Sequence, residues 1–126
     1  MTEHYDLQRF VAAQDSPDPC SRERLSYFVA ARSQMEQGLK TSHWMWFIFP
    51  QIAGLAPSAT SLQYAISSLE EAKAYLLHPI LGPRLRECTR LVNLVEGRSI
   101  EQIFGYIDKK KFRSSMTLFA RATEDN

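Results

Sequence analysis

The chain has 126 residues, and 44% of them are hydrophobic or aromatic, so it can bury the core of one domain. Fifteen Lys and Arg residues against fourteen Asp and Glu residues give a net charge of +1. This balance removes the usual electrostatic argument for nucleic acid or an anionic membrane, and the apolar content excludes a disordered polymer. We expect a single domain over residues 1–126 that binds no nucleic acid.

The two cysteines, Cys20 and Cys88, are too few for a disulfide framework, and neither lies in a CxxC pair. The sequence therefore predicts free thiols, no metal site and no cofactor. The start of the chain lacks the basic and apolar segments of a signal peptide. The longest apolar run, 44–49, is far shorter than the ~20 residues of a membrane-spanning helix. We expect a cytoplasmic protein with no membrane segment.

Apolar residues at helical spacing predict a first helix over about 6–13. Asp, Ser and Pro residues form a turn at 15–19, and a longer second helix follows over 22–37. Ser21 is the expected N-cap of this second helix, and Gly38 is its expected C-cap.

The segment from Ser42 to Pro50 is a nearly continuous apolar run, which fits a buried strand or a buried helical turn. Nothing else in the chain has the pattern of a strand, and a lone strand would leave its backbone groups unpaired. We therefore expect a short buried helix that ends at Pro50.

The next segments are also helical in pattern. Residues 58–64 fit one helical turn, and Ser68 with Glu71 has the spacing of a capping box, opening a helix that ends at Leu77. Pro79 breaks this helix and is expected to occupy the first position of the next one.

The last third of the chain continues the pattern. The helix that begins at Pro79 has an apolar stripe at spacings of three and four: Leu81, Leu85, Cys88, Leu91, Val92 and Val95. Gly97 is expected to end it, Ser99 and Gln102 form a second capping box, and Asp108 is the expected cap of a last helix. That helix carries four apolar residues on one face: Phe112, Met116, Phe119 and Ala120. The sequence thus predicts an all-α fold, a compact single-domain array of about seven helices, several of them short.

Histidine and tryptophan fall together in one segment. His43 adjoins Trp44 and Trp46, and Gln51 follows closely. In one interpretation these residues are a hydrophobic anchor of the core, with His43 as a cap. In the other they line an aromatic-walled pocket, with Gln51 as a polar contact and His43 as the candidate catalytic group for proton transfer.

A second candidate group lies near the C-terminus. Lys111, Ser114 and Ser115 share a face of the last helix, and a cation beside hydroxyl groups suits a carboxylate or a phosphate. A lysine run is more often a solvated helix face, so that interpretation stays open. His78, before Pro79, is either a helix cap or a ligand contact.

Four blocks of the chain, 42–51, 64–66, 75–85 and 113–119, resemble the signature blocks of the bacterial domain of unknown function 1810 family. The resemblance covers most of the chain and implies an all-α fold with no established activity. It implies these candidate site residues: His43, Trp44, Trp46, Pro50, Gln51, His78, Lys111, Ser114 and Ser115.

Three departures from the family pattern stand out. The family has Gly-Leu-Gly where this chain has Gly54-Leu55-Ala56, and a second acidic residue where this chain has Lys109. Family members also continue past Ala122 with a further helix, so this chain is C-terminally short relative to them. We expect this ending to leave the apolar face of the last helix partly uncovered. Self-association or a truncated chain would each explain such an ending.

The family is often automatically labelled calpastatin, and this label conflicts with the sequence. An inhibitor of that type is a disordered chain rich in Pro, Ser, Lys and Glu, whereas this chain has the apolar content and helix caps of a protein that folds alone. Two functions stay open. The first is a protein that binds a small anionic ligand in an aromatic-walled pocket, with or without catalysis. The alternative is a protein-interaction or homo-oligomeric helical module without enzymatic activity.

Overall fold

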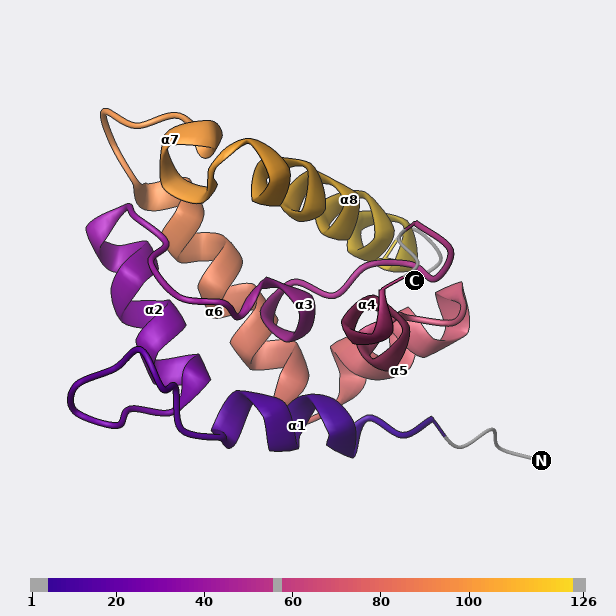
Figure 1. Ribbon diagram of the computed structural model, residues 1–126. Helices are drawn as coiled ribbons and strands as arrows, with labels where there is room; N and C mark the ends of the chain where they lie inside the picture. Colours follow the sequence, from indigo (N-terminus) through magenta and orange to yellow (C-terminus); the bar gives the residue numbers. More distant parts are fainter. Residues whose placement is uncertain (1–4, 56–57, 124–126) are drawn as a thin grey trace.

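The computed structural model describes residues 5–55 and 58–123, and in these residues the chain forms eight α-helices (Figure 1). The helices are α1 (Gln8–Asp15), α2 (Tyr27–Gln37), α3 (Met45–Ile48), α4 (Ala59–Tyr64), α5 (Leu69–Leu77), α6 (Leu81–Leu94), α7 (Ile100–Phe104) and α8 (Tyr106–Thr123). The predicted all-α fold is confirmed. The structure has one helix more than the predicted seven, namely α4, which the sequence predicts only as a helical turn.

The core forms where α5 packs on both α6 and α8, and where α2 packs on α6. The short helix α3 lies in the middle and contacts α1, α4 and α8 (Figure 1). Its surroundings are aromatic: the Phe49 ring lies 5.0 Å from that of Phe112 in an edge-on contact, and Phe112 stacks on Phe104 at 5.0 Å. The predicted short buried helix before Pro50 is therefore confirmed, and it brings the tryptophan segment to the centre of the fold.

The predicted start of the second helix is wrong by five residues. Ser26 caps α2, since its hydroxyl accepts the N–H of Val29 at 3.2 Å, whereas Ser21 accepts the N–H of Leu25 inside a loop. The loop closes on itself because Asp18 donates its N–H to the carbonyl of Leu25. The C-cap prediction is confirmed, with Gly38 in the left-handed region at φ 76°.

Helix boundaries in the second half are partly as predicted. The capping box of Ser99 and Gln102 forms completely. At α5 only half of the box forms, because the Glu71 carboxylate accepts from Ser67 instead of the Ser68 N–H. The α6 helix begins at Leu81 rather than Pro79 and ends at Leu94, before Gly97.

The last helix begins earlier than predicted. Gly105, at φ 85°, turns the chain from α7 directly into α8 at Tyr106. Asp108 therefore lies in the first turn of α8 instead of capping it. As a result its carboxylate is available for lysine side chains rather than for backbone N–H groups. None of the helices within 5–55 and 58–123 combines the length and the apolar composition needed to cross a membrane.

Candidate functional site

The ammonium group of Lys111 lies on the aromatic ring of Trp46, 3.8 Å from the ring centre. Its other neighbour is a carboxylate oxygen of Asp108, at 3.4 Å. Asp108 also pairs with Lys40 at 2.8 Å, so one carboxylate lies between two cations. These contacts fix the position of the Lys111 ammonium, and the Asp108 carboxylate already balances part of its charge.

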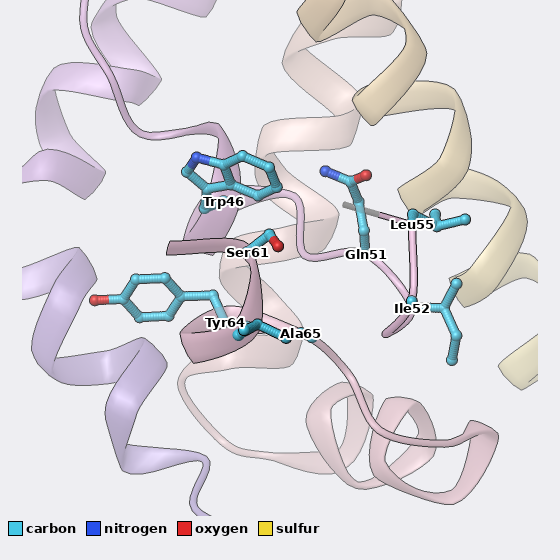
Figure 2. Close-up of a pocket in the computed structure, with 9 residues that line it drawn as sticks. Trp46, Gln51, Ile52, Leu55, Ser61, Tyr64 and Ala65 are labelled. Carbon is cyan, nitrogen blue, oxygen red and sulfur yellow. The ribbon is translucent and has the colours of Figure 1, made fainter. Parts of the chain in front are cut away.

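Trp46 and Gln51 line one small hollow, together with Ile52, Gly54, Leu55, Ser61, Leu62, Tyr64 and Ala65. Figure 2 shows the amide of Gln51 turned to the same side as the indole of Trp46. The hollow has a volume of about 20 Å³, which is room for about one water molecule. The Nε2 atom of the Gln51 side chain is buried and has no hydrogen-bond partner, whereas the backbone carbonyl of Gln51 accepts the N–H of Ile66 at 2.8 Å.

Ser115 is fully buried on α8, and its hydroxyl oxygen also has no hydrogen-bond partner. Buried polar atoms are nearly always satisfied, and leaving one unpaired costs about 1–3 kcal/mol. Ser115 follows Lys111 by one helical turn, so both project from neighbouring positions on α8. Gln51 Nε2 and Ser115 Oγ are therefore two buried polar atoms without a protein partner, one on the segment after α3 and one on α8.

A second, larger hollow of about 470 Å³ lies along α8. It is lined by Ile52, Leu55, Leu69, Ser114, Thr117, Leu118 and Arg121. Ile52 and Leu55 belong to both hollows, so these two side chains form the wall between them. Ser114, which the sequence groups with Lys111, therefore faces the larger hollow.

The other predicted tryptophan is part of the core. Trp44 is 0% exposed, and its indole N–H donates to Gln34 Oε1 at 2.9 Å. The same oxygen accepts the backbone N–H groups of Thr41 and Ser42. Gln34 thus fixes the turn into α3, a role that no local pattern signals because the partners are seven to ten residues away.

Neither predicted histidine lines these two hollows. His43 is exposed, next to the buried Trp44. The Nδ1 atom of His78 accepts the N–H groups of Ile80 and Leu81 at 3.1 and 3.2 Å, so His78 caps the start of α6. Pro50 is buried after α3. The structure thus places Lys111 on Trp46 and Trp46 beside Gln51, whereas Ser115 is buried on α8 and lines neither hollow. Trp44, His43 and His78 also line neither hollow.

The lysine run of α8 is occupied by local contacts. Lys109 pairs with Glu101 at 2.7 Å, and this contact lowers the pKa of the Glu101 carboxyl. Lys110 lies over the Tyr106 ring at 4.4 Å. A row of free cations, as a phosphate backbone requires, does not form at these three positions.

Groups elsewhere offer little chemistry. Burial raises the pKa of Cys88 to about 12, so its thiol stays protonated and unreactive near neutral pH. Burial also raises the pKa of the Tyr75 hydroxyl. In the part of the chain that the structure describes, no three His, Cys, Asp or Glu side chains gather to hold a metal ion.

Comparisons with known proteins agree with the resemblance seen in the sequence. The family described as "Protein of unknown function (DUF1810)" matches residues 4–126. The crystal structure of the conserved hypothetical protein Rv1873 from Mycobacterium tuberculosis is similar, with 53% sequence identity and a TM-score of 0.85. The match covers 97% of this chain and 80% of that one. No curated protein matches the chain.

Proposed function

We propose a function from the chain's own residues, since it belongs to the DUF1810 family of proteins of unknown function. The chain binds a small anionic ligand where α8 meets the segment after α3. Lys111 supplies the charge, Trp46 supplies an aromatic wall, and Gln51 and Ser115 supply hydrogen-bonding atoms. The observation that carries the proposal is the Lys111 ammonium held on Trp46, whose indole lines a small hollow together with the unpartnered Gln51 Nε2.

The arrangement suits an anion for a simple reason. An amide N–H, a hydroxyl and an ammonium are all donors, and a carboxylate or phosphate accepts from each of them. The hollow beside Gln51 holds about one water molecule, so the ligand extends outward from this junction rather than into it.

Calorimetric titration with phosphate, acetate and succinate tests this proposal. Lys111→Met is expected to lower the affinity for whichever of these anions binds by roughly tenfold, because the substitution removes a charged hydrogen bond. Lys110→Met is the matched control, since Lys110 is exposed and lies on Tyr106. The same loss in both variants, or no heat with any anion, would contradict the proposal.

Tryptophan fluorescence locates the site independently. Trp46 contacts Lys111 and lines the hollow, whereas Trp44 is buried in the core. An anion-induced change in emission is expected to disappear in Trp46→Phe while the Trp44 signal stays constant. His43→Ala is expected to leave binding unchanged, because His43 is exposed and lines neither hollow.

A second candidate function is self-association, as expected for a helical module without enzymatic activity. A groove of about 580 Å³ between α5, α6 and α8 exposes apolar side chains, Leu94 among them at 60%. Exposed apolar surface of this kind is typical of protein contacts, and a second copy of the chain is the occupant we infer. A mass that rises with concentration in light scattering supports it, and a constant monomer mass rejects it.

We also infer a cytoplasmic place of action. Cys20 and Cys88 are both free, as in proteins that remain in a reducing compartment.

A further inference from the structure

Four residues of α8 form one stripe along its surface: Lys111, Ser114, Leu118 and Arg121. Their spacing of three, four and three residues places them on the same face of a helix. With a rise of 1.5 Å per residue, the two cations at its ends are separated by about 15 Å along the axis. The stripe therefore has a positive charge at each end and a hydroxyl and a leucine between.

The middle of this stripe is the floor of the larger hollow. Ser114, Leu118 and Arg121 line it from α8, and Ile52, Leu55 and Leu69 line it from the other side. Figure 2 shows Ile52 and Leu55 on the side of the smaller hollow that is nearer to α8. The volume of the larger hollow, about 470 Å³, falls in the range of pockets that hold small organic molecules, and the lining of this hollow is mostly aliphatic.

Arg121 is a cation of α8 that lines the larger hollow, and like Lys110 and Arg113 it takes part in none of the ion pairs of the described residues. Lys109 and Lys111 each pair with a carboxylate, whereas none of the ion pairs found within 5–55 and 58–123 includes Arg121. A cation in the last turn of a helix is favoured by the helix dipole, which explains the residue type. The dipole does not explain why this guanidinium lines an aliphatic hollow, where an anion with an apolar body would satisfy both features.

We propose that the ligand is an elongated dianion with an aliphatic middle. One anionic group pairs with Lys111, the hydrocarbon lies on Leu118, and the second anionic group pairs with Arg121. This inference rests on the proposed function, because it assigns the chemical class of the same ligand. Its occupant is a free small molecule rather than a membrane lipid, since a lipid headgroup presents its charge at one end only.

The test compares α,ω-dicarboxylates, from succinate to dodecanedioate, with monocarboxylates of the same chain length. Monocarboxylates are expected to bind through Lys111 alone. Long dicarboxylates are expected to bind about two- to fivefold more tightly than their monocarboxylate partners, as one partly exposed ion pair provides. Affinity is expected to peak at one intermediate length, because the two cations are a fixed distance apart.

Arg121→Gln is expected to remove the preference for dicarboxylates and to leave monocarboxylate affinity unchanged. Arg113→Gln is the matched control, because Arg113 is exposed on the same helix and lines neither hollow. Thr117→Phe, which fills the larger hollow from its exposed rim, is expected to remove the dependence on chain length. Circular dichroism shows whether each variant is folded.

The outcomes separate the two proposals. Monocarboxylates that bind through Lys111, with dicarboxylates no tighter and Arg121→Gln without effect, would overturn the dianion and leave the proposed function standing. A wild-type protein that binds no carboxylate or phosphate would overturn both. Binding to anionic phospholipid vesicles without binding to any soluble dicarboxylate would also overturn the dianion.

Discussion

Glu71 shows how a single residue can join distant parts of this fold. Its carboxylate is nearly inaccessible, pairs with Arg9 at 3.0 Å, and accepts from the N–H and the hydroxyl of Ser67. From the sequence, Glu71 is the partner of a local capping box at Ser68. The residue type and the helix start are predicted in this way, but Arg9 is 62 residues away, and no local rule relates them.

Glu71→Ala is expected to destabilise the protein by about 3 kcal/mol, because it leaves the Arg9 guanidinium without its charged partner in a partly buried place. Glu70→Ala is the control. Glu70 is exposed beside it in the same first helical turn, and its loss is expected to cost less than about 1 kcal/mol. Urea denaturation measures both. Equal effects would mean that the Arg9 contact contributes nothing beyond helix-end electrostatics.

At the scale of helices, the connection between α5 and α6 depends on the absence of one side chain. A Cβ atom on Gly82 would lie 2.1 Å from the carbonyl oxygen of Leu76, at the end of α5. Gly82 is therefore what allows the first turn of α6 to approach α5 so closely. The sequence shows only a Gly-Pro pair that delays the helix, since a close backbone approach leaves no periodic trace.

Gly82→Ala is expected to lower the free energy of unfolding by more than about 3 kcal/mol, because two backbones must separate. Gly54→Ala is the comparison, since no atom lies within 4 Å of its added Cβ. Its positive φ of 95° alone is expected to cost about 1–2 kcal/mol. A Gly82 variant no less stable than the Gly54 variant would show that the helix pair adjusts without loss.

For the molecule as a whole, periodicity and caps predicted the fold class and most of the helices. The all-α array, the buried helix before Pro50 and the box at Ser99 follow from local rules, which act over three or four residues. The start of α2 differs from the prediction because backbone hydrogen bonds join the residues on either side of the 18–24 loop.

At the site, helical spacing groups Lys111 with Ser114 and Ser115. The separation of Trp46 from Trp44 depends on Gln34, which only the tertiary fold brings to the indole.

Gln14 ties these separately predictable helices into one unit. Its amide nitrogen donates to the carbonyl of Phe47 at 2.8 Å and to the hydroxyl of Tyr75 at 3.2 Å, and its oxygen accepts from Arg84 at 3.1 Å. One buried side chain on α1 therefore binds α3, α5 and α6. Because the helices are short and none is stable alone, we expect them to unfold together.

Gln14→Ala is expected to cost about 3 kcal/mol, because it leaves several buried polar groups unpaired. In a Tyr75→Phe background the cost of Gln14→Ala is expected to fall by about 1 kcal/mol, since one of those groups is then absent. Circular dichroism and tryptophan fluorescence are expected to report the same midpoint in urea for every variant. If α1 instead unfolds first, helicity falls before the emission of Trp44 changes, and Gln14 then anchors a single helix instead of joining the fold.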